Sequence, residues 1–144
     1  MPTAQSILNR KGTTVATIDR EAVVLDAATL MNQRRIGALV VTSGEKVVGI
    51  FTERDVLNRI VAAGLDPRTT HVGKVMTSPT ACCRRDTKLS ECRSVMTEKR
   101  IRHLPVVEDG KLYGMVSAGD ILASEVAEQQ ATIEYLNEYL HGHR

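Results

Sequence analysis

Two seven-residue segments, GIFTERD and GMVSAGD, share a glycine, a hydroxyl residue and an aspartate at the same spacing. The hydroxyl and acidic residues are Thr52 and Asp55 in the first segment and Ser117 and Asp120 in the second. If a helix begins at the hydroxyl residue, its free backbone N–H groups and positive dipole end can bind a phosphate. The same residues also form a capping box, in which both side chains pair with backbone N–H groups. The pattern therefore leaves open ligand binding, capping or both.

The two segments belong to an internal repeat. Shifting the chain by 65 positions superimposes the two aspartates, and the match runs without a gap from Arg35 and Arg100 to Leu57 and Leu122. Repetition of this kind indicates a fold built from two similar units. These units should share a core, because a lone unit of about 60 residues buries too little surface to be robust.

Each repeat is expected to contain a short helical lead, an extended segment, an amphipathic helix, two strands joined by a turn, and a second helix. Apolar residues at helical spacing mark the inner face of the amphipathic helices: Val24, Ala27 or Ala28 and Met31, then Leu89, Cys92 and Met96. β-Branched and apolar segments around Ser43-Gly44 and Asp109-Gly110 predict two hairpins. A final helical stripe contains Ile133, Leu136 and Leu140.

The repeated elements resemble those of a known family. The G-h-h-(T/S)-x-x-D element follows RIGALVV in the first repeat and RIRHLPVV in the second, an order similar to that of paired cystathionine-β-synthase (CBS) domains, or Bateman modules. The resemblance implies an α+β fold of two β-α-β-β-α repeats packed sheet to sheet with pseudo-two-fold symmetry. We assign residues 1–65 to the first CBS repeat, 66–126 to the second and 127–144 to a C-terminal helical extension.

The resemblance also implies a cleft for an adenosyl ligand in each repeat. The aspartate of the element would accept hydrogen bonds from the ribose hydroxyls, and the hydroxyl residue would contact phosphate, so these roles fall on Asp55 with Thr52 and on Asp120 with Ser117. A flat apolar slot with a few backbone hydrogen bonds suits the adenine ring. The implied adenine-contacting residues are Val15, Ala16, Thr17, Thr80, Ala81 and Cys82 from the opening segments, with Ala38, Val40, His103 and Pro105 from the strands.

The two expected clefts differ in charge. The resemblance places Arg102 and His103 near the phosphates of the nucleotide held by the other repeat, where the first repeat has only glycine and alanine. Arg54 adds another cation beside Asp55, and an arginine can bind phosphate through two hydrogen bonds. We therefore expect the Asp55 cleft to prefer several phosphates. The Asp120 cleft, with small residues inside its element, should bind more weakly, prefer AMP or stay empty.

Other polar residues are expected to have structural roles. Lys99 and Arg100 end a helix, where cations interact favourably with the dipole, so they are interpreted as a solvated turn. The three cysteines lack zinc-site or disulfide-framework spacing. Cys82 and Cys83 are neighbours on an extended segment, so their side chains should point to opposite faces and be inert.

Composition excludes several classes of protein. Apolar residues make up 42% and charged residues 25%, as in globular proteins. A net charge of +2 and an aromatic content of 3% disfavour nucleic-acid binding. Apolar runs are far shorter than the ~20 residues of a membrane span. The N-terminal segment lacks the apolar core of a secretory signal, so a cytoplasmic location is expected.

These features favour a regulatory module that binds AMP, ADP, ATP or NAD(H), with S-adenosylmethionine ranked behind them. Binding would change the conformation of the pair or its contact with a separate, unidentified target protein. The alternative is a ligand-free homodimeric interaction module whose capping boxes act only as caps and whose C-terminal stripe contributes to the dimer. The regulatory module is expected to form the same dimer. Neither an enzyme nor a catalytic cofactor is expected, since the sequence places no nucleophile beside a base.

Overall fold

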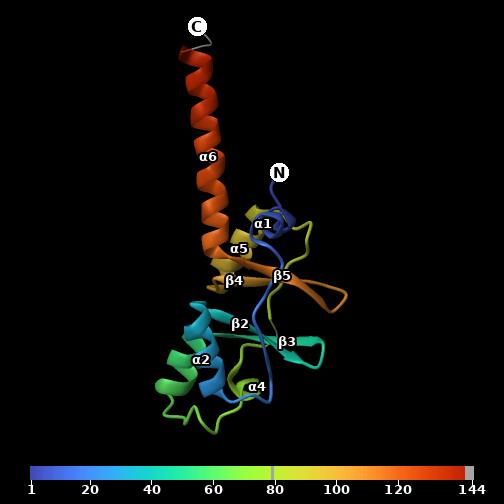
Figure 1. The fold of residues 1–144 in the computed structure, drawn as a ribbon, viewed down its shortest axis with the longest axis vertical. Coiled ribbons are helices and arrows are strands. Elements are labelled where there is room, and N and C mark those ends of the chain that lie inside the picture. The colour runs from blue at the N-terminus through green and yellow to red at the C-terminus, as the bar shows by residue number, and fades with distance from the viewer. Residues whose placement is uncertain (79, 142–144) are drawn as a thin grey trace.

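Two small sheets with their helices form the body of the protein, and one long helix extends from it (Figure 1). The computed structural model describes residues 1–78 and 80–141. The elements of the first half are α1 (Ala4–Lys11), β1 (Thr17–Asp19), α2 (Val24–Arg34), β2 (Ala38–Ser43), β3 (Lys46–Thr52), α3 (Glu53–Asp55) and the π-helix η1 (Val56–Val61). Those of the second half are α4 (Val72–Val75), α5 (Leu89–Lys99), β4 (His103–Glu108), β5 (Lys111–Ser117) and α6 (Ala118–His141).

Both predicted hairpins are confirmed. β2 pairs antiparallel with β3 and parallel with β1, and β4 pairs antiparallel with β5. Two-residue hairpin turns require positive φ, which Gly44 supplies at +62° in the first hairpin. Asp109 at +52° and Gly110 at +76° supply it in the second. The sequence therefore fixes both turns locally.

A proline explains why the sheet of the second half is smaller. In the first half, the backbone N–H of Val40 donates to the carbonyl of Ala16 over 3.1 Å, next to β1. Pro105 occupies the equivalent position of the second repeat and has no N–H to donate. The opening segment of this repeat is held by Cys83, whose N–H donates to Pro105 and whose carbonyl accepts from Val107, at 3.0 and 2.9 Å. A single bridge therefore replaces a strand.

The apolar helix faces expected from the sequence are buried. The buried residues are Val24, Ala27 and Met31 in α2, and Leu89, Cys92 and Met96 in α5. Of the two alanines that the pattern left open, Ala27 is the buried one and Ala28 is half-buried. Each helix thus covers its own sheet with one stripe.

The short lead helices pack in the opposite halves. α1 precedes the first repeat, yet Ala4, Ile7 and Leu8 are buried in the core of the second half. α4 precedes the second repeat, and Val72 and Val75 are buried in the core of the first half. The packing therefore crosses the expected boundary between residues 65 and 66, and the domain limits drawn from the sequence stay predictions.

The two sheets face each other, as predicted. Ala38, Val40 and Ile50 from the first sheet form a buried cluster with Met115 from the second. Val15 packs against the edge of this cluster. The predicted α+β architecture of two repeats packed sheet to sheet is confirmed, and its functional consequence is a junction to which both repeats contribute side chains.

α6 continues far beyond the body of the molecule (Figure 1). It runs without a break over 24 residues, and the predicted extension is its outer part, with residues 142–144 outside the described region. The side chains of Ile133, Leu136 and Leu140 are 52%, 47% and 67% exposed. Among the described helices, none is both long and apolar enough to cross a membrane.

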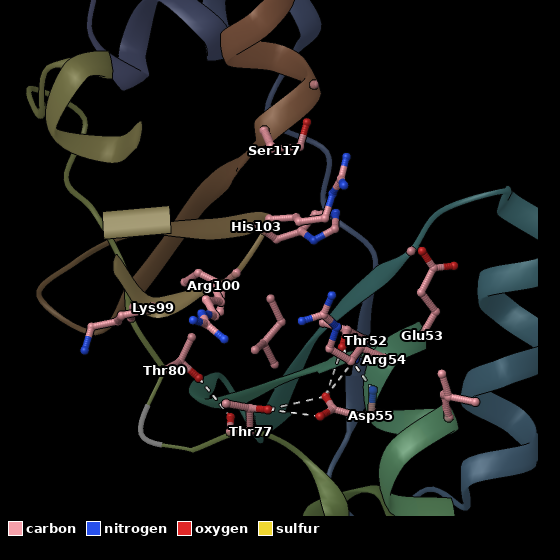
Figure 2. Close-up of a pocket in the computed structure, with 18 residues that line it drawn as sticks. Thr52, Glu53, Arg54, Asp55, Thr77, Thr80, Lys99, Arg100, His103 and Ser117 are labelled. Atoms are coloured by element: carbon pink, nitrogen blue, oxygen red, sulfur yellow. Dashed lines mark hydrogen bonds between the residues drawn. The ribbon is translucent and has the colours of Figure 1, made fainter. Parts of the chain in front are cut away.

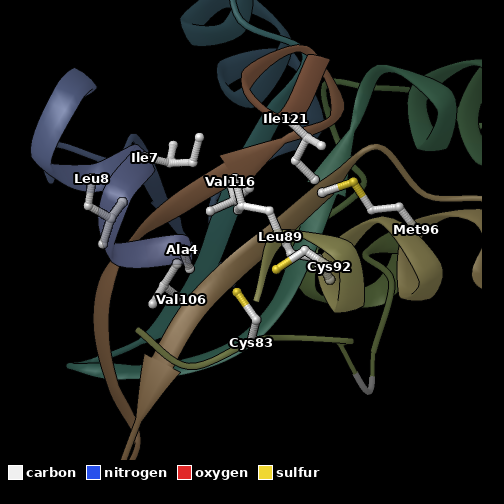
Figure 3. Close-up of a cluster of buried hydrophobic side chains, with 11 residues drawn as sticks. Ala4, Ile7, Leu8, Cys83, Leu89, Cys92, Met96, Val106, Val116 and Ile121 are labelled. Atoms are coloured by element: carbon white, nitrogen blue, oxygen red, sulfur yellow. The ribbon is translucent and has the colours of Figure 1, made fainter. Parts of the chain in front are cut away.

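The cysteines occupy two environments. Cys82 is exposed, whereas Cys83 is buried, so the predicted alternation of these neighbours is confirmed. Figure 3 shows the sulfur atoms of Cys83 and Cys92 facing each other in the core of the second half. The hydrogen bond with Cys92, together with burial, raises the pKa of the Cys83 thiol far above its ordinary value. Cys83 is therefore protonated at neutral pH, and an inert thiol agrees with the sequence interpretation.

Candidate functional site

Both capping boxes form at the ends of β3 and β5. The backbone N–H of Thr52 donates to Asp55 Oδ2 over 3.0 Å, and the N–H of Asp55 donates to Thr52 Oγ1 over 3.3 Å. The equivalent bonds between Ser117 and Asp120 are 2.9 and 3.0 Å long. Both elements therefore begin helices, and the structural role left open by the sequence is present at each.

Some of the backbone N–H groups at the two helix N-termini already donate hydrogen bonds within the protein. The N–H of Glu53 donates to the carbonyl of Gly37 over 3.0 Å, and that of Ala118 donates to Arg102 over 2.8 Å. With the Asp55 amide bound to Thr52, two of the first three amides of α3 have protein partners. Anion binding here must therefore depend strongly on side chains.

Asp55 is the centre of a buried polar network. Its side chain is 8% exposed, and Oδ1 accepts a 3.1 Å hydrogen bond from the hydroxyl of Thr77. Arg59 Nε lies 3.6 Å from the same oxygen, while a second nitrogen of this guanidinium donates to the carbonyl of Met76 over 2.8 Å. Oδ2 serves the cap, and Oδ1 ties the helix to the segment after α4 that contains Met76 and Thr77, called the linker below.

A cavity of about 1040 Å³ opens beside this network, between the two halves. Figure 2 shows Asp55 and Thr77 on one side of this space and His103 and Ser117 on the other. The predicted site residues that line it are Thr52, Arg54, Asp55, Thr80, Ala81, Arg102, His103 and Ser117. One cavity therefore collects side chains that were assigned from the sequence to both repeats.

The remaining predicted residues lie outside this cavity. Val15, Ala38 and Val40 belong to the cluster between the sheets, and Ala16 packs against the first core. Thr17 lies in β1, Cys82 is exposed and Pro105 is buried in β4. The first opening segment thus contributes to packing in this structure, whereas Thr80 and Ala81 of the second one reach the cavity.

The cavity is richer in positive charge than the sequence interpretation expected. Arg54 and Arg102 line it as predicted, and Lys99 and Arg100 join them. Lys99 and Arg100 are both exposed at the C-terminal end of α5, in agreement with the interpretation as a solvated turn. The side chain of Arg100 also points into the same space as that of Arg54 (Figure 2). Its backbone has φ +56°, the left-handed conformation, which is uncommon for a residue with a side chain. This helix end turns Arg100 toward the cavity.

His103 is mostly neutral at pH 7. Burial lowers its pKa below the ordinary value near 6.5, Arg102 and Lys11 act in the same direction, and Glu53 and Asp120 oppose them. Between the folded pKa and about 6.5 the unfolded chain binds more protons, so stability that is present at higher pH is lost as the pH falls through the folded pKa. We expect urea denaturation to show a steeper loss between about pH 7 and pH 5 for the wild type than for His103→Gln. Parallel pH profiles of the two proteins would contradict this prediction.

Asp120 has a partner that the sequence did not reveal. Lys11, the last residue of α1, donates to Asp120 Oδ2 over 2.7 Å. Burial alone would raise the pKa of Asp120, but the hydrogen bonds from Lys11 and Ser117 outweigh it and lower the pKa. Both aspartates of the repeat therefore have a cationic neighbour, but their surroundings differ: Asp55 lines the large cavity and has Arg59 at 3.6 Å, whereas Asp120 pairs with Lys11 at 2.7 Å.

The repeat, the fold and the paired elements agree with one family of proteins. A family model described as the CBS domain matches the chain twice, at residues 9–62 and 72–126. The chain belongs to the CBS-domain family. Tandem CBS domains are generally regulatory modules that bind adenosyl ligands, and they are typically non-catalytic.

Several CBS proteins are similar over most of the chain. CBSX3 of Arabidopsis thaliana, named as mitochondrial, is 40% identical over 124 residues, which are 83% of this chain and 60% of the relative. YhcV of Bacillus subtilis is 30% identical over 126 residues, 88% of this chain and 89% of the relative. A solved CBS-domain protein of Burkholderia ambifaria has 38% identity and a TM-score of 0.85, covering 89% of this chain and 96% of the other. The chain thus spans less than two thirds of the Arabidopsis protein.

Three residues of this CBS pair were given no place in the site by the sequence interpretation: Lys11, Thr77 and Arg100. Lys11 and Asp120 lie 109 positions apart, so no local pattern links them. Thr77 reaches Asp55 because its backbone pairs with Ile50 on β3. Arg100 gave a signal, since it aligns with Arg35 at an equivalent helix end, and both have positive φ.

Proposed function

We propose that this CBS pair is a regulatory sensor that binds an adenine nucleotide with two or more phosphates, such as ATP, ADP or NAD(H), in the cavity beside Asp55. One observation carries the proposal: four basic residues, Arg54, Lys99, Arg100 and Arg102, line the same cavity as the buried carboxylate of Asp55. A cluster of arginines is suited to phosphate oxygens, and a carboxylate is suited to ribose hydroxyls. S-adenosylmethionine, which carries no phosphate, ranks behind these ligands.

The geometry supports a specific division of roles. The ribose would replace the hydroxyl of Thr77 at Asp55 Oδ1, while Oδ2 keeps its capping bonds to Thr52. The adenine would lie toward Thr80 and Ala81, and the phosphates toward Arg54, Arg100 and the second repeat. The cavity of about 1040 Å³ is at the upper end of the range of small-molecule sites, roughly 300 to 1,000 Å³, so it has room for a whole nucleotide.

Binding of such a nucleotide would also change a contact that helps to hold the two repeats in place. Taking Thr77 away from Asp55 would release one tie between the first repeat and the linker, which Arg59 also holds through the carbonyl of Met76. Binding would then bias the relative arrangement of the two repeats, by no more than the difference in ligand affinity between the two arrangements. The receiver of the signal is proposed to be a separate protein, as in the sequence interpretation.

The experiment is isothermal titration calorimetry of the purified protein with AMP, ADP, ATP, NAD, NADH, S-adenosylmethionine and GTP. Affinity that rises with phosphate number and is lost with GTP would support the proposal. Saturation at ~100 times the dissociation constant should also add about 2.7 kcal/mol of stability, which a thermal shift can measure. No heat and no thermal shift at millimolar concentration would favour the ligand-free interaction module.

Arg100 offers a test that separates function from stability. Arg100→Gly should raise the free energy of unfolding by roughly 0.5 to 1 kcal/mol, because glycine adopts positive φ without strain. It should lower ATP affinity about tenfold, since a charge-assisted phosphate contact is lost. Arg35→Gly is the matched control, with φ +53° at the equivalent helix end and no place in the cavity lining. It should gain the same stability and keep the affinity, and equal affinity in both variants would remove Arg100 from the site.

Self-association is the second part of the proposal. Leu57 and Leu122 are 60% and 61% exposed at equivalent positions of the repeat, as are Val61 and Val126 at 67% and 55%. Paired apolar residues on the two helices, continued along α6, suit a symmetric homodimer. Molar mass from light scattering tests it. A ligand-free interaction module could use the same surface to form a homodimer. The cytoplasmic location expected from the sequence stays a prediction.

A further inference from the structure

A narrow stripe of side chains runs along the exposed side of α6. Its members are four and three residues apart in alternation: Leu122, Val126, Gln129, Ile133, Leu136 and Leu140. At about 100° per residue, this spacing keeps all of them within a stripe about 80° wide. Such a narrow stripe is typical of a coiled-coil seam, because a helix that covers a globular core has a broader apolar face. We call these residues the α6 seam.

The α6 seam is exposed in the chain that carries it. Its apolar side chains are 47% to 67% exposed: Leu122, Val126, Ile133, Leu136 and Leu140. Ile121, one residue before the seam, is buried in the core of the second half, so α6 contacts its own body through a different face. The outer part of the helix runs away from both sheets (Figure 1). The seam is therefore available to a partner.

The residue types of the α6 seam suit two parallel helices. In heptad notation, Val126 and Ile133 occupy a positions, and Leu122 and Leu136 occupy d positions. β-Branched residues at a with leucine at d favour a parallel pair. Gln129 is the polar residue of the seam, at d. It faces its own counterpart only when the two helices are parallel and in register, whereas an antiparallel pair would bury its amide against an apolar residue at a.

The charges of α6 leave the seam free to meet a second copy. Glu128, Glu134 and Glu138 lie more than about 100° from the centre of the stripe, on the outer face. Glu125 lies beside the seam and forms an ion pair with Arg93 of α5. The later flanking positions carry no charge: Ala123, Gln130, Thr132, Asn137 and Tyr139. Two copies of this acidic helix can therefore approach along the seam without strong repulsion between like charges.

An anionic membrane is another surface that accepts an exposed apolar helix face. Helices that bind such membranes are rich in lysine and arginine on their polar face. Residues 112–143 contain neither, and the glutamates of α6 make its polar face negative. A negatively charged lipid surface would repel this helix, so the charge pattern favours the second copy.

We infer that α6 pairs with the same helix of a second copy in a parallel, in-register coiled coil, with the Gln129 side chains of both copies facing each other. The inference rests on the self-association proposed above and deepens it by fixing the orientation of the two chains. The two-fold axis then runs along the paired helices, and both bodies lie at the same end. Leu122 and Val126 belong to the seam and to the surface proposed for self-association, so the coiled coil continues that surface.

The first test is disulfide cross-linking of the full chain with oxidised glutathione. Each variant also carries Cys82→Ser, because Cys82 is the exposed native thiol. Gln129→Cys and Leu136→Cys should both give covalent dimers, since identical d positions face each other in a parallel pair. Ala131→Cys, on the opposite side of the helix, is the control and should run as a monomer on a non-reducing gel.

The second test adds charge to the seam and uses sedimentation equilibrium. Gln129→Glu would bury two carboxylates against each other, so the dissociation constant of the dimer should rise at least about tenfold. Ala131→Glu adds the same charge on the outer face and should change that constant by less than about twofold. Equal dissociation constants of the two variants would overturn the inference.

The outcomes separate this inference from the proposed self-association. If light scattering shows a dimer but Gln129→Cys or Leu136→Cys fails to cross-link, the parallel coiled coil is overturned, while self-association through the body stands. A molar mass above that of two chains overturns the two-stranded arrangement. A monomeric wild type with no cross-link at either position overturns both proposals, and the seam would then belong to a different partner.

Discussion

Gly49→Ala should lower the free energy of unfolding by about 1 to 3 kcal/mol, the usual cost of overpacking. A Cβ at this position would lie 2.8 Å from the carbonyl oxygen of Thr77 and 2.7 Å from the sulfur of Met76. The sulfur can move, but the carbonyl accepts from the N–H of Ile50 over 3.1 Å as part of the bridge that holds the linker. The backbone of the linker must therefore shift.

The expected loss is clear because the ordinary effect of this substitution has the opposite sign. Glycine to alanine commonly stabilises a protein by about 0.4 to 1 kcal/mol where the backbone is compatible, since the unfolded chain loses freedom. Gly119 provides that control, because an added Cβ would meet only the Ser117 hydroxyl at 3.7 Å. Urea denaturation should place Gly119→Ala at or above the wild type and Gly49→Ala well below it. Equal stability of the two variants would contradict the close approach of linker and sheet.

The equivalent glycine of the second repeat gives a further comparison. A Cβ on Gly114 would collide with the side chain of Leu8 on α1, which is a flexible group and not backbone. Leu8→Ala should therefore relieve much of the strain of Gly114→Ala, giving a favourable coupling energy in a double-mutant cycle. Met76→Ala should relieve little of the strain of Gly49→Ala. The glycine of each repeated element is thus explained by a segment from outside its own sheet.

Local physical rules predicted the helices and the hairpins, and the resemblance to CBS pairs predicted how the two repeats pack. Helical spacing identified Val24 and Met31 in α2 as core residues, and Asp109-Gly110 specified a tight turn. The exchange of α1 and α4 between the halves was not predictable, because a short amphipathic helix can cover either of two similar cores. The loss of an opening strand at Pro105 follows from its missing N–H, but only once the register of the repeat is known.

The residues of the candidate site also fall into two groups, those that were predicted from the sequence and those that were not. Thr52, Asp55 and Arg102 were assigned through the resemblance to CBS pairs, and they line one cavity. Thr77 and Lys11 were missed because each reaches its aspartate through tertiary packing, the former by a bridge to β3 and the latter by the burial of α1. Spacing along the chain identifies residues that share an element, whereas the partners of a side chain depend on which elements meet.

Asp55→Asn should lower ATP affinity about 10- to 100-fold, because hydrogen bonds from the ribose to an ionised carboxylate are each worth about 1.5 to 3 kcal/mol. The isosteric amide keeps one oxygen as an acceptor for the capping amide of Thr52, while the ion pair with Arg59 is lost. We expect the free energy of unfolding to fall by about 1 to 2 kcal/mol, leaving the protein folded. Calorimetric titration, with urea denaturation of the same sample, measures both quantities.

Asp120→Asn is the matched control, since it changes the equivalent residue of the repeat and also loses one ion pair. Its pair with Lys11 is partly exposed, so the free energy of unfolding should fall by less than about 1 kcal/mol. Affinity at the Asp55 cavity should not change. If Asp55→Asn loses stability but keeps the affinity of the wild type, Asp55 is a helix cap and no more. The basic cavity would then bind its anion without recognising a ribose, and the adenosyl specificity proposed for this CBS pair would have no residue to carry it.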